Sequence, residues 1–279
     1  MSTTSNEPLA VTIVGAAGRM GRRLLACAAA LPRMRIVGAA DAPGHPRLGD
    51  DAGRLAGLDA LQVALTADLA AACAPAQVVI DFALAQGVAE RMALYARLAR
   101  AVVLGTTGLD AAGRAAVQRA ARGVPVVHAP NFSLGVNLLF ALAERAAASL
   151  GDDYDVEVIE MHHRRKEDAP SGTAVRLVEV IERARGLAPE TVRCHGRQGV
   201  TGARPRGQIG IHAVRGGDVV GDHTVVFAAE GERVELVHKA GSRDTFAHGA
   251  LRAALFVAGK PAGLYAMADV LGVAMEASQ

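Results

Sequence analysis

Aromatic residues are scarce in this 279-residue sequence, which has six phenylalanines, three tyrosines and no tryptophan. The interior therefore has to be filled by aliphatic side chains, and hydrophobic residues do make up 51% of the chain. That content is ample for a sizeable core. The length suits one large domain or two ordinary ones.

Cysteine is also rare. The three cysteines, Cys27, Cys73 and Cys194, lie far apart in the sequence and form no C-x-x-C pair. This spacing argues against a disulfide framework and against a thiolate zinc site. It is typical of a reduced intracellular protein.

A strong net charge and a targeting segment are missing as well. The formal charge is +2, so a nucleic-acid-binding surface is not indicated. The opening "MSTTSNEPLA" lacks the basic and apolar regions of a signal peptide, and no apolar run approaches membrane-spanning length. We therefore expect a soluble, cytoplasmic protein with neither a nucleic-acid partner nor a membrane partner.

What is present begins with a nucleotide-binding pattern. Residues 9–15, "LAVTIVG", are typical of a buried parallel strand, and "GAAGRMGRRLLACAAA" starts at the last of them. Gly15, Gly18 and Gly21 suit a chain that turns tightly, approaches a pyrophosphate and lets the next helix pack on the strand. The spacing departs from G-x-G-x-x-G, because Ala16 stands at the first glycine position.

An acidic residue completes this pattern. The strand-like run 34–40 ends at Asp41, about 20 residues beyond Gly21, where an acid would bind the ribose 2′-hydroxyl. The alternative is that Asp41 is a turn residue in "DAPG". Strand, glycine loop, helix, strand and acid together favour a dinucleotide site.

The alternation of strands and helices continues to residue 132. Strands are predicted over 76–82, 101–108 and 124–132, and helices over 86–100 and 110–123. This order predicts an α/β fold with a Rossmann-like, doubly wound parallel sheet. In such a sheet, ligands bind outside the carboxyl ends of the strands.

That rule nominates seven residues as the rim of a cofactor cleft: Gly105, Thr106, Thr107, Ala129, Pro130, Asn131 and Phe132. Other roles stay open for three of them. Thr106 and Thr107 could cap the next helix, although Asp110 could do so instead. Asn131 could make an Asx turn.

The second half of the chain changes character. Strand-like segments are joined by glycine-rich and acidic turns, and "AAEGERVE" predicts a hairpin connection. This pattern indicates a second, α+β domain with a mixed or antiparallel sheet. A final helix is expected from about residue 242, with Ser242 or Asp244 as its cap. The expected domains are 1–132, completed by 242–279, and 133–241.

A basic cluster, "EMHHRRKEDAPSGTA", occupies residues 160–174. In a strand, Glu160 and His162 lie on one face and His163 lies on the other, so the two histidines do not form a metal pair. We expect no metal site. A single histidine at a strand end could act as a general acid or as a cationic partner for an anion.

The rest of the cluster adds a cation and a helix start. Lys166 precedes Pro170, Gly172 lets the backbone approach a ligand, and Ser171 or Thr173 can cap the helix. A helix N-terminus binds carboxylates readily, so a small polycarboxylate suits this segment. The alternative is a solvated basic loop before an ordinary capped helix. Surface, core or strand-end roles are expected for the other histidines, His223 and His238 among them.

These strings resemble one known family over nearly the whole chain. "VTIVGAAGRMGR", "DFA", "GTTG", "NFSLGVN", "HKAGSRDTFAHGAL" and above all "E-x-H-H-x-x-K-x-D-A-P-S-G-T-A" are similar to the 4-hydroxy-tetrahydrodipicolinate reductases, formerly dihydrodipicolinate reductases. The resemblance implies NAD(P)H-dependent reduction of 4-hydroxy-tetrahydrodipicolinate to tetrahydrodipicolinate, with loss of water, in lysine and diaminopimelate biosynthesis. It also implies a homotetramer assembled through sheets of the substrate-binding domain.

The resemblance assigns roles to individual residues. His162 matches the proton donor and acceptor, and Lys166 matches a second proton donor. Substrate contacts are implied for His163, Gly172 and Thr173. The dinucleotide contacts that it implies are Gly15, Ala16, Ala17, Gly18, Arg19, Met20, Asp41, Gly105, Thr106, Thr107, Ala129, Pro130, Asn131 and Phe132.

One departure concerns cofactor choice. Family members that accept NADPH often carry a basic residue after the ribose acid, and here that residue is Ala42. Because Asp41 would repel a 2′-phosphate, we expect NADH to be preferred. Arg19 or Arg47 could still admit NADPH. The rival hypotheses are a dehydrogenase acting on aspartate and a nicotinamide-sensing regulator without catalysis.

Overall fold

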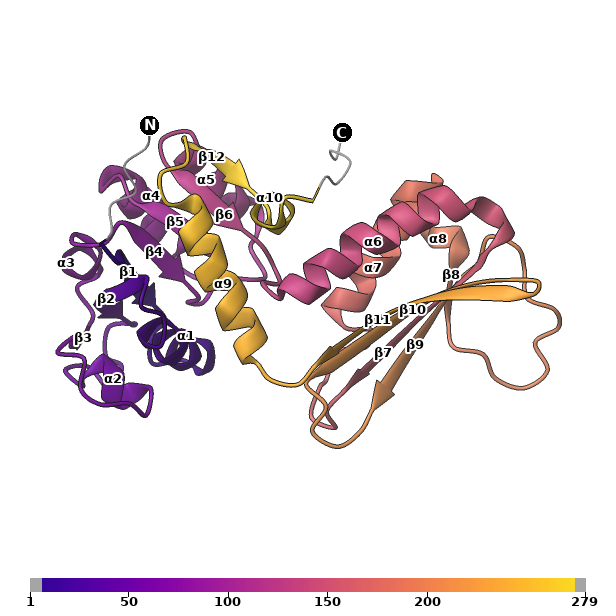
Figure 1. Ribbon diagram of the computed structural model, residues 1–279, viewed down its shortest axis with the longest axis horizontal. Coiled ribbons are helices and arrows are strands. Elements are labelled where there is room, and N and C mark those ends of the chain that lie inside the picture. Colours follow the sequence, from indigo (N-terminus) through magenta and orange to yellow (C-terminus); the bar gives the residue numbers. More distant parts are fainter. Residues whose placement is uncertain (1–6, 274–279) are drawn as a thin grey trace. The chain divides into compact units, whose positions relative to one another are not determined.

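The computed structural model describes residues 7–273, and the chain divides into two compact units (Figure 1). Unit 1 contains residues 7–134 and Arg243–Leu271, so a C-terminal segment joins the N-terminal one. Unit 2 contains Gly135–Ser242 together with Gly272 and Val273. Each unit has its own hydrophobic core.

A seven-stranded parallel sheet forms the centre of unit 1, in the order β12-β6-β5-β4-β1-β2-β3. The inner strands are nearly continuous aliphatic runs, because both faces of the sheet are covered. The strands are β1 (Leu9–Val14), β2 (Met34–Ala40), β3 (Leu65–Thr66), β4 (Val78–Asp81), β5 (Ala101–Leu104), β6 (Pro125–His128) and β12 (Gly263–Tyr265).

Helices cover both faces of this sheet, which confirms the predicted doubly wound fold. One face packs against α1 and α9, and the other packs against α4 and α5 (Figure 1). The helices are α1 (Arg19–Ala29), α2 (Ala52–Leu55), α3 (Leu69–Cys73), α4 (Val88–Arg97), α5 (Ala111–Ala121), α9 (Asp244–Val257) and α10 (Met267–Leu271). Helix α9 contacts β4, β5 and β6, so the C-terminal segment builds part of the unit 1 core.

The predicted start of α9 was wrong in detail. Arg243 stands at the N-cap, so neither Ser242 nor Asp244 takes that position. The Asp244 carboxylate instead pairs with the Arg23 guanidinium of α1, with an Nη2–Oδ2 distance of 2.7 Å. This contact links the two helices that share one face of the sheet.

Unit 2 contains a five-stranded mixed sheet, in the order β11-β10-β7-β9-β8, as the sequence predicted. Strand β10 is antiparallel to β7 and β11, whereas β7, β9 and β8 run parallel. Ala229 pairs with Glu232, which confirms the predicted hairpin. The strands are β7 (Asp155–His162), β8 (Arg193–His195), β9 (Ile209–Arg215), β10 (Gly221–Ala229) and β11 (Glu232–Ala240).

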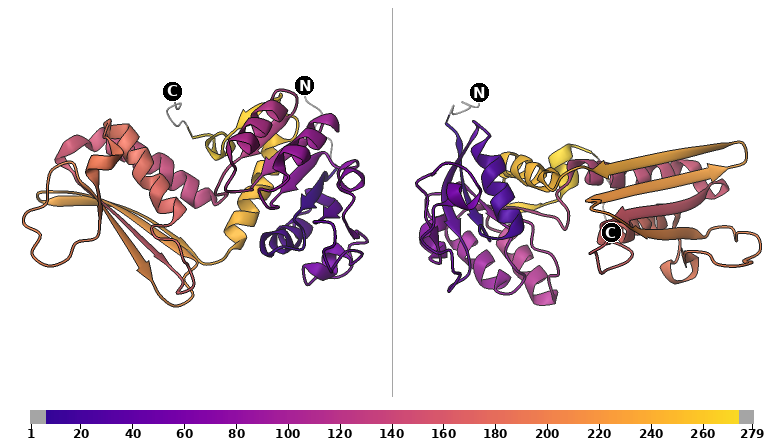
Figure 2. Two further views of the ribbon diagram at one scale, coloured as in Figure 1. Left: turned by 180° about the vertical axis from the view of Figure 1, so that it is seen from behind. Right: turned by 90° about the horizontal axis from the view of Figure 1, so that it is seen from below.

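Two long helices lie on the same face of this sheet and enclose the unit 2 core (Figure 2). They are α6 (Leu134–Leu150) and α7 (Gly172–Arg185), and two short elements, η1 (Gly151–Asp153) and α8 (Pro189–Val192), follow them along the chain. On β7 the inward side chains alternate with outward ones, of which Ile159 is 38% exposed. On the hairpin strand β11, Val237 is 52% exposed.

Helix α6 opens the segment Leu134–Asp153, which is the one stretch of the described residues long and apolar enough to cross a membrane. The expectation that no run approaches this length was therefore wrong. The same length and composition occur in core helices, and α6 packs Phe140 and Ala143 into the unit 2 core. Glu144 of α6 also pairs with Arg183 of α7, at 2.6 Å.

Candidate active site

The glycine loop of unit 1 has the conformation that its sequence predicts. At Gly15 the chain takes φ +76°, a region that a side chain would disfavour. The Gly15 N–H donates to the Ala40 carbonyl at 2.9 Å, which ties the end of β1 to β2. A Cβ on Gly21 would lie 2.1 Å from the Gly15 carbonyl oxygen. Helix α1 can therefore approach the loop only because residue 21 is glycine.

The N-terminus of α1 points its first backbone N–H groups out of this loop. Its N-cap is Gly18, which has no side chain to accept a hydrogen bond from them. Arg19 and Met20 form the first turn. These N–H groups are available to a phosphate, and the partial positive charge of the helix start favours that anion.

Asp41 follows β2 directly and lies against the glycine loop. Its carboxylate accepts the Ala17 N–H at 2.9 Å and the Ala42 N–H at 2.8 Å. The contact to Ala42 is local to the following residue, and the contact to Ala17 links the acid to the loop. The pattern strand, loop, helix, strand and acid is assembled as predicted, and the ribose role of Asp41 stays a prediction.

The segment after β5 is fixed by contacts to the segment after β4. A Cβ on Gly105 would lie 2.3 Å from the ring of Phe82, so only glycine fits there. The Thr106 hydroxyl donates to the Ala83 carbonyl at 2.9 Å, and Thr107 stays exposed. Asp110 caps α5 through the Gly113 N–H at 2.7 Å. The capping role therefore belongs to Asp110.

Residues 129–132 complete this edge of the sheet after β6. The Asn131 Oδ1 accepts the Ser133 N–H at 2.8 Å, which is an Asx turn. The Phe132 ring packs against the Phe82 ring, with centroids 5.4 Å apart. Ala129 and Phe132 are buried, whereas Pro130 is exposed. The loops after β4, β5 and β6 thus form one continuous rim, and this rim together with the glycine loop and the start of α1 fits a dinucleotide.

Sequence reasoning gave no role to Asp81, the last residue of β4. Its buried carboxylate accepts hydrogen bonds from the Arg91 Nε at 2.7 Å, the Tyr95 hydroxyl at 3.0 Å and the Ala83 N–H at 2.9 Å. Burial, and then the Asp81 charge, raise the pKa of Tyr95 well above its usual value, so the phenol remains a donor. Asp81 therefore anchors the loop that carries Phe82.

In unit 2, strand β7 ends at His162, and this residue faces the helices together with Glu160, as the alternation predicted. The His162 Nδ1 lies 2.6 Å from the Glu160 Oε2. Burial alone would raise the pKa of Glu160, but its hydrogen bonds with Arg215 and His162 hold that pKa below its usual value. The carboxylate stays charged and orients the imidazole.

Two further groups hold the Glu160 carboxylate. Arg215, at the end of β9, donates from Nη1 to Oε2 at 2.7 Å and from Nη2 to Oε1 at 2.8 Å. The Ser171 N–H donates to Oε1 at 3.0 Å. Ser171 also caps α7, because its hydroxyl accepts the Ala174 N–H at 3.2 Å. One carboxylate therefore joins the end of β7 to the start of α7.

The remaining residues of the basic cluster lie around this helix start. The Lys166 Nζ donates to both carboxylate oxygens of Asp168, at 2.8 and 2.9 Å. In the described part of the chain, a Cβ at Gly172 would meet no atom within 4 Å beyond its chain neighbours. Thr173 is half-buried in the first turn, and so is His163 after β7. The His163 Nδ1 is buried and has no hydrogen-bond partner among the described residues.

His223 is a neighbour that sequence reasoning missed. It lies on β10, is 3% exposed, and its Nε2 is 3.3 Å from the Ser171 hydroxyl oxygen. The pKa of His223 is lowered to about 4, mainly by burial, and the charges of His162 and His238 contribute in the same direction. The pairing of β10 with β7 places it here, and the sequence carries no local signal of that pairing. Arg164, Arg165 and Glu167 are exposed, as expected.

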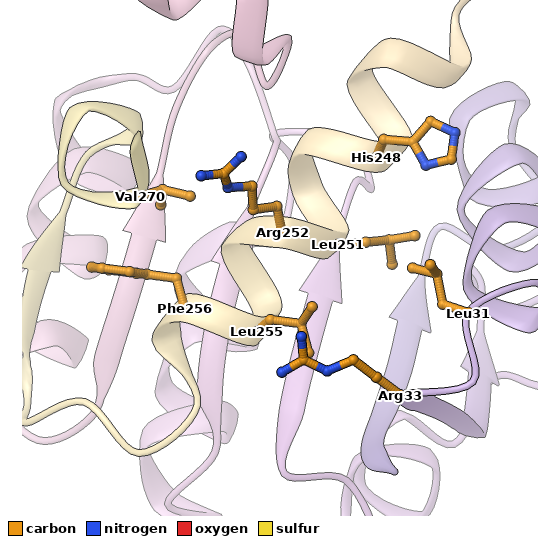
Figure 3. Close-up of a pocket in the computed structure, with 8 residues that line it drawn as sticks. All are labelled: Leu31, Arg33, His248, Leu251, Arg252, Leu255, Phe256 and Val270. Carbon is orange, nitrogen blue, oxygen red and sulfur yellow. The ribbon is translucent and has the colours of Figure 1, made fainter. Parts of the chain in front are cut away.

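Hollows also lie elsewhere on the units. The hollow in Figure 3 is in unit 1, where Arg33 immediately precedes β2 and therefore marks the amino edge of the sheet, away from the candidate cofactor rim. Its lining residues are Leu31, Arg33, His248, Leu251, Arg252, Leu255, Phe256 and Val270. Another hollow of unit 1 lies beside Arg47 and Asp51, and a hollow of unit 2 lies beside Pro170 and His195. Among residues 7–273, no group of three or more His, Cys, Asp and Glu side chains is arranged to hold a metal ion.

The chain matches one protein family along nearly its whole length. The family described as "Dihydrodipicolinate reductase, N-terminus" matches residues 9–132, and "Dihydrodipicolinate reductase, C-terminus" matches residues 135–271. A 4-hydroxy-tetrahydrodipicolinate reductase from Anaeromyxobacter sp. (strain Fw109-5) is 53% identical over 263 residues, which are 94% of this chain and 97% of that protein. The enzyme of the same name from Aromatoleum aromaticum is 49% identical over 276 residues, covering 98% and 100%.

A solved structure agrees with these matches. The dipicolinate-bound dihydrodipicolinate reductase from Paenisporosarcina sp. TG-14 is 28% identical, with a TM-score of 0.75, and the match covers 93% of this chain and 97% of that one. Together the matches identify a pyridine-nucleotide-dependent oxidoreductase of lysine and diaminopimelate biosynthesis. The chain belongs to the dihydrodipicolinate reductase family.

Proposed function

We propose that this enzyme reduces 4-hydroxy-tetrahydrodipicolinate to tetrahydrodipicolinate, with NADH preferred and with His162 and Lys166 as its catalytic residues. The observation that carries the proposal is the geometry at the end of β7. There a histidine is oriented by a buried, charged carboxylate, close in the chain to a lysine and to the start of helix α7.

The dinucleotide belongs to unit 1 in this proposal. The N–H groups at the start of α1 bind the pyrophosphate, Asp41 binds the ribose, and the rim formed by residues 105–107 and 129–132 borders the nicotinamide. Gly105 supports the placement of the nicotinamide at this rim, since the loop that carries Gly105 passes directly over the Phe82 ring. When bound, the dinucleotide supplies the hydride.

The substrate belongs to unit 2. The related structure is named as dipicolinate-bound, and dipicolinate is a small aromatic dicarboxylate. We place one substrate carboxylate at the N–H groups of Gly172 and Thr173, where a helix start favours an anion. The free Nδ1 of His163 is a further donor or acceptor for the substrate. Lys166 would leave Asp168 and hold a carboxylate.

The chemical step needs a proton and positive charge beside the ring. Loss of water gives a conjugated ring, and hydride addition at carbon 4 develops electron density that a proton must meet. His162 suits this role because Glu160 holds Nδ1 and leaves Nε2 to face the substrate. Lys166 assists the proton transfer.

The cofactor preference follows from the residues around Asp41. Ala42 offers no cation for a 2′-phosphate, and Asp41 would repel one. The Arg47 guanidinium, which could have served instead, pairs with the Asp50 carboxylate. Arg19 is exposed at the start of α1 and is the remaining candidate.

We further propose a cytoplasmic homotetramer that is assembled through unit 2. The face of the five-stranded sheet opposite α6 and α7 exposes Ile159 and Val237, which a second copy of the sheet would cover. Apolar side chains gathered on one surface are typical of an interface. Sedimentation of the purified protein gives its mass in solution.

The reaction is tested by following NADH absorbance while the preceding synthase makes the substrate in situ from pyruvate and aspartate semialdehyde. We expect rapid oxidation of NADH, slower oxidation of NADPH, and a loss of about 10²–10⁴-fold in rate for His162→Ala. Turnover with aspartate would favour the rival dehydrogenase. Cofactor binding without any turnover would favour a regulator. Normal turnover by His162→Ala would show that the catalytic assignment is wrong.

A further inference from the structure

We propose that Arg215 is a positioning residue for this reaction, which fixes both His162 and the loop of Lys166 without touching the substrate. The inference rests on the proposed function, because it assumes that His162 and Lys166 act in catalysis. Arg215 is 55 residues from Glu160 in sequence and lies beside it through the pairing of β9 with β7.

The first contact of Arg215 controls the charge next to His162. Glu160 has a fully buried side chain, and its two oxygens receive the two terminal nitrogens of the Arg215 guanidinium at 2.7 and 2.8 Å. A carboxylate shared between two cations stabilises each of them less than it would stabilise one alone. Arg215 therefore keeps Glu160 charged and also prevents it from holding the His162 proton too firmly for transfer.

The second contact of Arg215 reaches the lysine loop. Its Nη2 also donates to the Asp168 carbonyl at 2.7 Å, and the Asp168 carboxylate holds the Lys166 Nζ. The same strand end is bound to β7 by the Gly216 N–H, which donates to the His162 carbonyl at 2.9 Å. One guanidinium thus sets the relative position of the imidazole and of the loop that carries the lysine.

An arginine is needed for this bridge. Its planar fork presents two nitrogens to a carboxylate and a further N–H to the Asp168 carbonyl. A lysine at position 215 could pair with Glu160 as a point charge, but one ammonium cannot span both carboxylate oxygens and that carbonyl. A neutral side chain would leave a buried carboxylate with His162 and the Ser171 N–H as its partners.

The charged and titratable groups around His162 come from several elements. Glu160 lies on β7 itself, Arg215 comes from β9, and His223 comes from β10, with its ring 5.2 Å from that of His162. Lys166 and Asp168 come from the loop before α7. Of these, Glu160 is the direct partner of His162, so changes at Glu160 and at Arg215 act on His162 in opposite directions.

The test compares Arg215→Met, Arg215→Lys and Glu160→Gln in the assembled enzyme. We expect kcat to fall about 10- to 100-fold for Arg215→Met, the size expected when a catalytic group is misplaced. Arg215→Lys should recover part of that loss. The double variant of Arg215→Met and Glu160→Gln should be little worse than either single one, because both changes break one unit.

The pH profile separates positioning from a purely structural role. The falling limb of kcat/KM at high pH reports the loss of the catalytic proton. For Glu160→Gln this limb should move to lower pH, because the carboxylate that stabilises the imidazolium is gone. For Arg215→Met it should move to higher pH, because Glu160 then acts on His162 alone. Guanidinium ion added at millimolar concentration should restore part of the Arg215→Met rate.

Arg193→Met is the matched control. Arg193 also donates two hydrogen bonds to a buried carboxylate, that of Glu182, both at 2.7 Å. Glu182, however, lies near the C-terminal end of α7, whereas Ser171 caps its N-terminal end. This variant should lose thermal stability as Arg215→Met does, and it should keep the wild-type kcat and pH profile.

Wild-type kcat and an unmoved pH profile in folded Arg215→Met would overturn the proposal. So would independent, multiplying losses in the double variant. If Arg215→Met fails to fold, the pH profiles of Arg215→Lys and Glu160→Gln are used instead, and unmoved profiles in both variants would overturn the proposal. His162→Ala is assayed in the same series. If His162→Ala is inactive while the Arg215 variants behave like the wild type, only the proposed role of Arg215 is wrong. If His162→Ala turns over normally, the proposed catalytic assignment itself is wrong.

Discussion

The imidazole rings of His162 and His223 meet edge to face, with their centroids 5.2 Å apart. His223 is almost fully buried, and its pKa is lowered to about 4 by burial and then by its histidine neighbours. Near neutral pH it is therefore an uncharged hydrogen-bonding partner of Ser171. The buried site can then hold a proton on His162 without a second imidazolium beside it.

This relationship predicts an acid-sensitive fold. In the unfolded chain His223 becomes protonated below its ordinary pKa of about 6.5. In the folded protein its pKa is about 4, so it stays neutral until the pH falls to about that value. Stability is therefore complete above about pH 6.5 and falls as the pH is lowered towards 4, by about 2 kcal/mol at pH 5. His238, whose pKa burial also lowers, acts in the same direction.

Urea unfolding at pH 7.5 and at pH 5 measures this effect. The variant His223→Gln keeps a hydrogen-bonding group and cannot take up the proton, so it should lose less stability between the two pH values than the wild type does. An equal loss in both proteins would assign the acid sensitivity to other groups.

A second prediction concerns the ion pair between Lys166 and Asp168. The lysine has to exchange Asp168 for a substrate carboxylate, so Asp168→Asn should lower KM. Because the Asp168 side chain is 63% exposed, the pair contributes little free energy, and we expect KM to fall by about 2- to 5-fold. The kcat value should change less.

Glu167→Gln is the control for Asp168→Asn. It removes the same charge from an exposed neighbouring position. Steady-state kinetics at two salt concentrations compare the variants. A similar fall in KM for both would show that overall charge, and not the Lys166 pair, sets substrate affinity.

Much of the site could be predicted from sequence because it is local. The glycine loop, α1 and Asp41 occupy one short stretch, and the period of two along β7 correctly placed Glu160 and His162 on the same face. The N-cap Ser171 was one of two candidates and follows from helix-capping preferences. These features need no knowledge of which strands pair.

The partners that were missed come from far along the chain. Arg215 reaches Glu160 because β9 lies parallel to β7, and His223 pairs with Glu160 in the register of β10 with β7. Such pairings depend on the whole sheet, so a reading of local patterns could not find them. Asp81 was overlooked for a similar reason, since its partners Arg91 and Tyr95 identify it only once α4 packs on the sheet.

A third prediction tests the close approach in the glycine loop. In Gly21→Ala the new Cβ would overlap the Gly15 carbonyl, so the loop has to shift away from α1. We expect the dissociation constant for NADH to rise at least about 10-fold, since a 1 Å displacement at a site has effects of that order. The melting temperature should fall too.

Gly123→Ala is the matched control for that variant. Its Cβ would meet only the Ala120 carbonyl oxygen among the described residues, at 3.8 Å. Titration of NADH fluorescence with each protein compares the affinities. Unchanged NADH binding by a folded Gly21→Ala protein would place the pyrophosphate away from this loop.

The last prediction concerns the choice between NADH and NADPH. Ala42 directly follows Asp41 and is exposed, so a longer side chain there has room to reach a 2′-phosphate. Ala42→Arg should therefore raise kcat/KM for NADPH relative to NADH by about 10-fold or more, as one charge-assisted hydrogen bond contributes about 1.5–3 kcal/mol. Ala42→Gln has a similar reach without the charge and serves as the control, for which the ratio should change much less. Asp50→Asn would release Arg47 and should shift the ratio in the same direction by a smaller amount. If Ala42→Arg and Ala42→Gln gave the same ratio, the charge after Asp41 would not set the preference, and Arg19 would become the residue to change next.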